Sequence, residues 1–505
     1  MSDSEGMENH ESSLLIQAIA NAINALRNEL IDMQWEHAMV QRLQSACRLS
    51  GGILNSICEI ELSQGIIQGK VGSTVSGVAF YSFQGIPYAQ PPVGDLRFKA
   101  PRGAPSWEGV KDASSVGSSC SMSEDCLYIN VYSPQLPNGN ETNSLLPVMV
   151  WIHGGGFNVG SGSPSLYGPG FLLEKEILLV TFNYRLGALG FLGLSHSEVS
   201  LNNGLKDQRA ALRWIQQNID RFGGDPARVT LFGESAGGVS VEYQLISPST
   251  SGLFQRAISG SGSVLNPWAY VDPASAQTRA RQLAQLLGCT AEDNNRRSSD
   301  GLAFLPTVED ETGSGGDVFL PATPLEILKS GNFNHVPYIT GFCSAEGKAW
   351  VAHMPPVLWD QLNNNFESFL PYDLNLTIGT NESQQVAALV RKFYFGNETA
   401  SLATIEHLVN LVTDSWFLHG IHRTVKFLQR HNSTPLYVYQ FSYEGRLSYS
   451  YIFQYNYAFP GAGHGDDLNY LFTTTYFNYT EFESNSTEMK TVRRMVTLWT
   501  NFAKS

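Results

Sequence analysis

The chain lacks the features of disordered and membrane-spanning proteins. Only 15% of its 505 residues are charged, whereas 42% are hydrophobic. A chain of this composition can bury a large core, which excludes intrinsic disorder and a fibrous class. It also has no run approaching the roughly 18 consecutive apolar residues that a membrane-spanning helix needs. We therefore expect a soluble protein without a transmembrane segment.

Basic residues are scarce relative to acidic ones. The sequence has 32 Lys and Arg against 46 Asp and Glu, a formal charge of -14. Such a chain as a whole repels nucleic acid and anionic membrane surfaces. Neutral or cationic small molecules are the expected partners, and nucleic acid is not.

Cysteine pairs with the spacing of zinc ligands are absent. No two of the six cysteines form a C-x-x-C pair, which argues against a cysteine-based zinc site. Seven N-x-[ST] sequons favour a secreted glycoprotein. The acidic N-terminus, however, shows no signal peptide, which begins with a basic region. A cytoplasmic location therefore stays open beside secretion.

The first 58 residues differ in character from the rest. Apolar residues recur at steps of three and four between Leu15 and Leu43, which predicts one long amphipathic helix over 13–46. Gly51 and Gly52 end the pattern. We expect residues 1–58 to form an N-terminal extension. Its helix either docks on the neighbouring domain, the favoured interpretation, or mediates self-association as a coiled coil.

From about Glu59 onward, short apolar runs alternate with helical spacing. Apolar runs at 148–152, 177–182 and 229–232 predict buried strands, and 205–222 has the spacing of a helix. Strands that alternate with helices indicate right-handed crossover units. The predicted fold class is α/β, with a mostly parallel sheet.

The strongest local motif is the G-x-S-x-G sequence at 233–237. It follows the predicted strand 229–232 and precedes a helical run that begins near Ala236, which is the context of a nucleophile elbow. Glycines two residues either side of Ser235 remove Cβ atoms that a sharp turn would force into neighbouring backbone. Ser235 is therefore the candidate nucleophile. The N–H of Ala236, at a helix start, is a candidate donor to a developing oxyanion.

A glycine run after the strand 148–152 supplies further candidate donors. His153 is followed by three glycines and Phe157, an HGGG-type sequence that contributes N–H groups to an oxyanion hole. We assign these donors to Gly155 and Gly156. A merely flexible loop is the alternative, although such loops rarely follow a buried strand directly.

The general base and its acidic partner must follow Ser235 in this fold class, which has the order Ser, acid, His. His464 lies in a glycine-rich polar loop, and Glu346 lies in a loop after the apolar run 336–342. These two are the favoured base and acid. His419 and His422 share a helical spacing that would suit a metal, but no acidic or cysteine ligand lies at ligand spacing beside them.

Several further motifs, in the same order, resemble those of the type-B carboxylesterase and cholinesterase family. They lie at 83–98 (FQGIPYAQPPVGDLRF), 123–132 (SEDCLYINVY), 153–157 (HGGGF), 182–185 (FNYR), 204–208 (GLKDQ) and 233–238 (GESAGG). The resemblance runs from about residue 59 to the C-terminus, and it is nearer to general carboxylesterases than to true cholinesterases.

This resemblance implies an α/β-hydrolase fold over 59–505, with a mostly parallel twisted central sheet and helices on both faces. It implies a triad of Ser235, Glu346 and His464 and the oxyanion donors named above. It also implies an acyl-pocket aromatic at Trp268 and a buried second-shell serine at Ser261. The family needs neither metal nor organic cofactor, and it implies secretion.

The sequence also departs from the family pattern. Only five residues separate Cys120 from Cys126, the loop that in cholinesterases holds a choline-stacking tryptophan, so a choline site is not expected. Whether these two cysteines are bridged stays open. The segment after Cys289 is also shorter than in the family, and the chain stops roughly a helix before the usual end.

Three functional hypotheses follow from these patterns. The first is a serine hydrolase that cleaves small neutral carboxylic esters through an acyl-enzyme. The second is a catalytically silent cholinesterase-like adhesion or scaffold protein, although such relatives usually lose the serine or the histidine. The third is an inactive truncated isoform, suggested by the missing segments.

Overall fold

A computed structural model describes residues 58–137, 145–194, 199–287, 304–309, 316–352, 354, 356–371, 374, 376–431, 433–453 and 459–505. The predicted helix at 13–46 and almost all of the predicted extension 1–58 lie outside these residues, as does Cys289. Among the described residues, no helix has both the length and the apolar character needed to cross a membrane.

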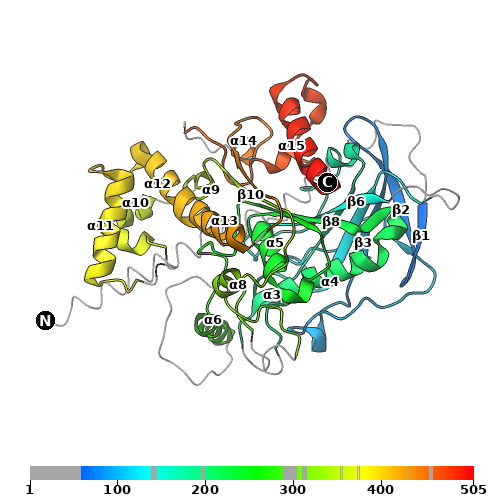
Figure 1. The fold of residues 1–505 in the computed structure, drawn as a ribbon, viewed down its shortest axis with the longest axis horizontal. Helices are drawn as coiled ribbons and strands as arrows, with labels where there is room; N and C mark the ends of the chain where they lie inside the picture. Colours follow the sequence, from blue (N-terminus) through cyan, green and yellow to red (C-terminus); the bar gives the residue numbers. More distant parts are fainter. Residues whose placement is uncertain are drawn as a thin grey trace.

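One eleven-stranded sheet forms the centre of the molecule (Figure 1). Its order is β1-β2-β3-β5-β7-β6-β8-β9-β10-β11, and β4 pairs with β2. The strands are β1 (Cys58–Leu62), β2 (Gly65–Ser73), β3 (Ala79–Pro87), β4 (Val110–Asp112), β5 (Tyr128–Ser133), β6 (Leu146–Ile152), β7 (Leu178–Phe182), β8 (Gly224–Glu234), β9 (Arg256–Gly260), β10 (Tyr338–Cys343) and β11 (Leu436–Phe441).

The sheet is parallel where the predicted catalytic residues lie. Strands β7, β6, β8, β9, β10 and β11 pair in parallel, whereas β1, β2, β3, β5 and β7 pair antiparallel. The first strands cannot be parallel neighbours, because β1 and β2 are joined by only two residues and a parallel pair needs a long crossover. The predicted strands 148–152 and 229–232 are confirmed as parts of β6 and β8, and the strand predicted over 177–182 is β7, which begins one residue later.

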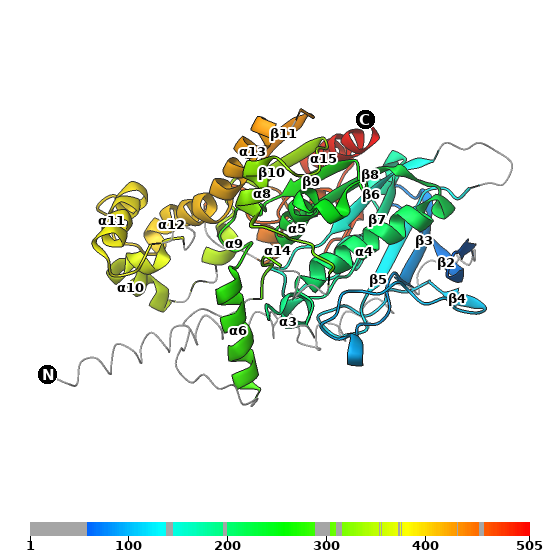
Figure 2. The same cartoon turned by 60° about the horizontal axis from the view of Figure 1, so that its bottom comes forward.

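Helices cover both faces of the sheet (Figures 1 and 2). The helices of the described chain are α3 (Gly187–Phe191), α4 (Asn203–Asn218), α5 (Ala236–Ile246), α6 (Pro273–Leu286), α8 (Pro324–Ser330), α9 (Lys348–Val351), α10 (Pro356–Asn364), α11 (Asn381–Phe395), α12 (Ile405–Val412), α13 (His419–His431), α14 (Tyr449–Ile452) and α15 (Thr487–Lys504), and not all of them lie on the sheet. Helices α4 and α5 cover one face, and α15 packs on the other, against β6 and β8. The helix expected over 205–222 is α4 followed by the 3-10 turn Ile219–Phe222.

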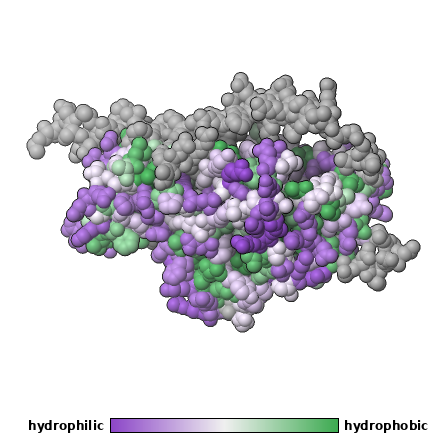
Figure 3. Space-filling view, turned by 90° about the horizontal axis from the view of Figure 1, so that it is seen from above, coloured by the Kyte–Doolittle hydropathy of each residue, from purple (hydrophilic) through white to green (hydrophobic). Residues whose placement is uncertain are grey.

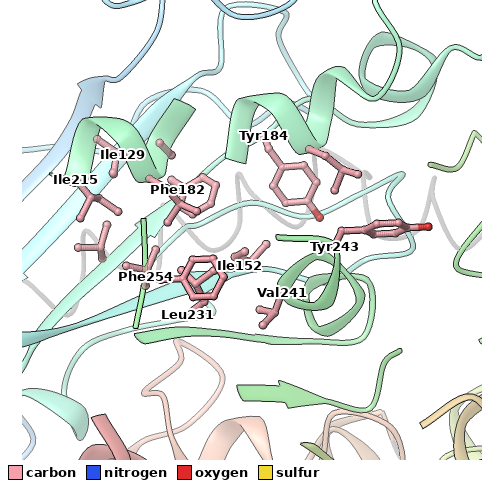
Figure 4. Close-up of a cluster of buried hydrophobic side chains, with 14 of the residues drawn as sticks. Ile129, Ile152, Phe182, Tyr184, Ile215, Leu231, Val241, Tyr243 and Phe254 are labelled. Atoms are coloured by element: carbon pink, nitrogen blue, oxygen red, sulfur yellow. The ribbon is translucent and has the colours of Figure 1, made fainter. Parts of the chain in front are cut away.

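Alternating side chains of β6 belong to two separate hydrophobic cores. Val148, Val150 and Ile152 belong to the core under α4 and α5, whereas Met149 and Trp151 belong to the core under α15. Figure 4 shows part of the first core, where sheet residues such as Ile152 and Leu231 lie near α4 and α5. Both faces of β6 are therefore buried, which explains the unbroken apolar run of this strand.

A smaller helical unit lies beside the sheet. Helices α10, α11 and α12 pack around their own apolar cluster, and Figure 1 shows them at the left, away from the sheet. The π-helix η8 (Thr413–Leu418) joins α12 to α13. On the face in Figure 3, hydrophilic residues are interspersed with small hydrophobic patches.

Candidate active site

Ser235 lies at a sharp turn between β8 and α5. Its backbone has φ 58° and ψ -127°, a conformation that a non-glycine residue rarely adopts. Its amide donates to the carbonyl of Gly260 at 2.9 Å, which ties the turn to the neighbouring strand β9. A Cβ on Gly237 would lie 2.0 Å from the carbonyl oxygen of Ile152, and one on Gly233 would lie 2.5 Å from Gly237. The predicted strand–elbow–helix and the steric reason for its glycines are both confirmed.

The glycine run lies directly beside this elbow. Strands β6 and β8 pair so that Ile152 is opposite Gly233, and a Cβ on Gly154 would be 3.0 Å from the Cβ of Ser235. Gly155 and Gly156 have φ values of 107° and 61°, in the region that favours glycine. Within the described chain, the N–H groups of Gly155, Gly156 and Ala236 have no acceptor. These donors can therefore stabilise a negative charge formed on a ligand.

Glu346 and His464 meet although 118 positions separate them. Nδ1 of His464 lies 2.6 Å from Oε2 of Glu346, whose carboxyl group is fully buried. The other oxygen of Glu346 accepts from the N–H of Cys343 at 2.7 Å. A carboxylate held in this way fixes the proton of the imidazole on Nδ1 and orients its Nε2.

Nε2 of His464 faces a second carboxylate. Oε1 of Glu234, the residue immediately before Ser235, lies 3.0 Å from this nitrogen. No hydrogen bond joins Ser235 Oγ to His464 among the bonds of the described residues. Burial lowers the pKa of His464, but the charges of Glu234 and Glu346 outweigh it and raise this pKa to about 9. The two neighbouring carboxyl groups therefore favour the protonated form of the imidazole.

Sequence reasoning assigned no role to Glu234, although the residue lies inside the elbow motif. Burial raises the pKa of its carboxyl group to about 8. Its contact with Nε2 depends on how the loop that carries His464 folds back over the end of β8. The elbow pattern constrains the glycines and the serine only, so the sequence contained no signal for this contact.

Asp466 anchors the loop that carries His464, and sequence reasoning also missed this role. Its carboxylate accepts from the N–H of Gly463 at 2.6 Å and from the N–H and Oγ of Ser450 at 2.8 and 2.6 Å. An Asp beside a glycine-rich turn typically binds nearby backbone N–H groups, and that was the available signal.

Aromatic rings surround His464. The ring centroids of Trp350 and Phe417 lie 4.8 and 5.0 Å from that of the imidazole, and Trp268 lies 5.6 Å from Phe417. The predicted acyl-pocket residue Trp268 therefore lies in the aromatic cluster next to His464. Trp350 and Phe417 come from separate segments without a shared motif, which explains why sequence reasoning did not find them.

Ser261 occupies a strained position behind the elbow. Its φ is 51°, and its amide donates to the carbonyl of Gly341 at 2.8 Å. Its buried hydroxyl has no hydrogen-bond partner among the described residues. The proposed second-shell role of Ser261 therefore stays a prediction.

The short loop between Cys120 and Cys126 is closed by a disulfide bond. The two Cα atoms are 5.0 Å apart. This answers the question that the sequence left open for this pair.

Comparison with known proteins gives one consistent family. The model of the carboxylesterase family matches residues 57–505. Esterase FE4 of Myzus persicae and a juvenile hormone esterase of Tribolium castaneum are each 36% identical, over 88% of this chain and 84% of their own length. Pyrethroid hydrolase Ces2e of Rattus norvegicus is 34% identical, over 86% of this chain and 79% of its own.

The fold has a solved counterpart. The crystal structure of juvenile hormone esterase from Manduca sexta, with OTFP covalently attached, superposes with a TM-score of 0.79 and 30% identity. The match covers 89% of this chain and 90% of the other. The central sheet with helices on both faces is thus an α/β-hydrolase fold, and the chain belongs to the carboxylesterase family.

Proposed function

We propose that the protein hydrolyses carboxylic esters through an acyl-enzyme formed on Ser235, with His464 as general base and Glu346 as its orienting acid. The observation that carries this proposal is the 2.6 Å contact between His464 Nδ1 and the buried Glu346, at the sheet edge where the elbow lies. A serine hydroxyl is a weak nucleophile unless an adjacent base takes its proton.

The proposed reaction has two halves. Nε2 of His464 accepts the proton of Ser235 Oγ while Oγ attacks the ester carbonyl, and the imidazolium then protonates the departing alcohol. Water, deprotonated by the same nitrogen, next attacks the acyl-enzyme, and the imidazolium returns the proton to Ser235 Oγ as the bond from Oγ to the acyl group breaks and the carboxylic acid leaves. In both halves, the amides of Gly155, Gly156 and Ala236 donate to the oxyanion. The reaction requires no metal or organic cofactor.

Glu234 sets the protonation state from which this reaction starts. With its carboxylate 3.0 Å from Nε2, the imidazole holds a proton and cannot act as a base. Activity therefore requires that Nε2 lose this proton and turn to Ser235. We expect the rate to rise as the pH increases toward the pKa of His464, about 9.

The proposed substrates are small neutral esters with apolar groups. Trp268, Phe417 and Trp350 place apolar rings beside the base, and Trp268 is proposed as the wall of the acyl pocket. The named relatives include a juvenile hormone esterase and a pyrethroid hydrolase, which does not single out one ester. Substrate profiling over acyl chain lengths would identify the preferred class.

We also propose that the protein is a secreted glycoprotein. A disulfide closes the loop at 120–126, and disulfides persist mainly in oxidising compartments. The four sequon asparagines that the structure describes are all exposed, at Asn381, Asn397, Asn478 and Asn485. One relative, 32% identical, is a venom carboxylesterase of Apis mellifera. A mass shift on treatment with an N-glycosidase after expression in insect cells would test this.

The test of the activity uses purified full-length chain and p-nitrophenyl acetate. We expect a burst of p-nitrophenol stoichiometric with enzyme, and covalent labelling of Ser235 by an organophosphate, located by mass spectrometry. Ser235→Ala should abolish both. A folded wild-type protein without burst or label would contradict the proposal and favour a silent adhesion or scaffold protein.

A further inference from the structure

The π-helix η8 exposes backbone carbonyl groups that side chains from another loop satisfy. Nδ2 of Asn266 donates to the carbonyl oxygens of Trp416 and Phe417 at 2.7 and 2.8 Å. Nε1 of Trp268 donates to the same carbonyl of Trp416 at 2.9 Å. A π-helix is rare and frequently marks a functional site. Here two side chains of one short loop hold it in place.

Asn266 is itself held rigidly. Its Oδ1 accepts from the N–H of Ser263 at 2.5 Å, and the hydroxyl of Ser263 donates to the buried carboxyl group of Glu242 at 2.9 Å. Glu242 lies on α5, the helix that starts directly after Ser235. We call the loop side chains Asn266 and Trp268, which bond to the carbonyls of η8, the clamp. Through Ser263 and Glu242, the clamp is bonded to the helix that starts at the elbow.

The start of α13, directly after the π-helix, also approaches Asn266 closely. A Cβ on Gly420, at the start of α13, would lie 2.6 Å from Nδ2 and 2.7 Å from the backbone nitrogen of Asn266. Contacts this short do not occur for real Cβ atoms, so glycine is required at this position.

The π-helix that Asn266 holds also contacts His464, the proposed general base. The ring of Phe417, whose carbonyl Asn266 holds, packs on His464 at 5.0 Å and on Trp350 at 5.1 Å. Trp350 in turn packs on His464 at 4.8 Å. The position of Phe417 therefore affects both the imidazole and the aromatic wall beside it.

We propose that Asn266 is a positioning residue that fixes the π-helix, so that Phe417 holds His464 in place and, with Trp268, sets selectivity for the acyl group. Asn266 bonds only to backbone groups, so it acts through Phe417 and not on the substrate. This inference rests on the proposed function of the site. It adds a positioning residue, Asn266, that the family motifs do not contain.

The test compares Asn266→Asp with a matched control, Asn363→Asp. Asn363 has the same pattern: its Nδ2 donates to the carbonyls of Trp359 and Ala400 at 2.9 and 2.8 Å, and its Oδ1 accepts from the N–H of Ala400 at 2.8 Å. Each substitution keeps the accepting oxygen and replaces the donor by an acceptor that faces two carbonyls. Asn363 lies on α10, in the separate helical unit. Its variant therefore measures the loss of stability caused by the substitution itself, away from the active site.

The readouts are kcat per titrated active site and the ratio of kcat/KM for p-nitrophenyl butyrate to that for the acetate. For Asn266→Asp we expect kcat to fall about 10- to 100-fold, because small misplacements of reacting groups cost rates of this order. We expect the butyrate-to-acetate ratio to change several-fold, since the wall is no longer fixed. Asn363→Asp should leave both readouts unchanged and lower only the melting temperature.

If Asn266→Asp fails to fold, Asn266→Ala supplies the second test. It removes both donors to η8 without adding a charge or a clash, and the same change in acyl ratio is expected. A ratio equal to that of wild type in the folded variant would overturn the inference while leaving the proposed function intact. An inactive wild-type protein would overturn both.

Discussion

Replacing Glu234 by Gln should move the pH dependence of the enzyme. The carboxylate of Glu234 lies 3.0 Å from Nε2 of His464 and stabilises the protonated imidazole. Two unit charges at this distance attract by roughly 1.4 kcal/mol at a dielectric constant of 80 and about 5.5 kcal/mol at 20. Since one pKa unit corresponds to about 1.4 kcal/mol, these two energies are the lower and upper limits of a shift in the pKa of His464, about one and four units.

The expected shift lies nearer the lower limit. The pKa of Glu234 is raised to about 8 by burial, so this group is mostly protonated, and therefore mostly uncharged, at neutral pH. We expect Glu234→Gln to lower the pKa of His464 from about 9 by one to two units. The acid limb of kcat/KM should move to lower pH by the same amount, because this limb follows the free-enzyme base.

The assay is the pH profile of kcat/KM for p-nitrophenyl acetate between pH 5 and 10, supported by NMR titration of the imidazole. Glu444→Gln is the control, since it removes a carboxylate that is half exposed and pairs with Lys348 at 3.7 Å. An unchanged acid limb in Glu234→Gln, with the Glu444 variant identical to it, would refute the electrostatic reasoning.

Three further predictions concern the oxyanion donors, the disulfide and stability. Gly155→Ala, at φ 107°, should lower kcat about 10²- to 10³-fold with little change in KM, measured by steady-state kinetics, because one donor is misplaced; a preserved kcat would exclude Gly155 as a donor. Replacing Cys120 and Cys126 by Ser should lower the free energy of unfolding by about 2 kcal/mol, measured by urea denaturation, and an unchanged stability would show that the bridge contributes nothing. The folded pKa of His464, about 9, exceeds its unfolded value of roughly 6.5, so the folded state retains a proton that the unfolded state loses. The contribution of protonated His464 to the stability of the folded state is complete below about pH 6.5 and is lost as the pH rises toward 9. The melting temperature should therefore decline over this pH range, and Glu234→Gln should make the decline less steep. An equally steep decline in that variant would contradict this link between protonation and stability.

The parts of the site that local sterics determine could be predicted from sequence. The glycines around Ser235 are needed because added Cβ atoms would meet backbone at 2.0 to 2.5 Å, and that requirement is visible in the motif itself. The choice of Glu346 and His464 came from the chain order Ser, acid, His of this fold class, from the loops that carry the two residues, and from the family resemblance.

Other features depend on contacts between distant segments. The facing of Glu234 toward Nε2 depends on how the loop at 461–465 folds, and the aromatic rings around His464 come from α9 and η8. The π-helix at 413–418 had the spacing of an ordinary helix and gave no separate signal. The antiparallel order of β1, β2 and β3 was also missed, because apolar periodicity does not report strand direction.

The strand order explains why the acid and the nucleophile need a histidine between them. The elbow follows β8 and Glu346 follows β10, with β9 in between, so two strand spacings of about 4.8 Å separate their backbones. An imidazole bonded to Glu346 through Nδ1 presents Nε2 toward the end of β8. There it meets the carboxyl group of Glu234, the residue immediately before Ser235. A protonated Nε2 favours the carboxylate, whereas in the proposed reaction a neutral Nε2 accepts the proton of the Ser235 hydroxyl. We therefore expect the loss of one proton to select the proposed catalytic pairing.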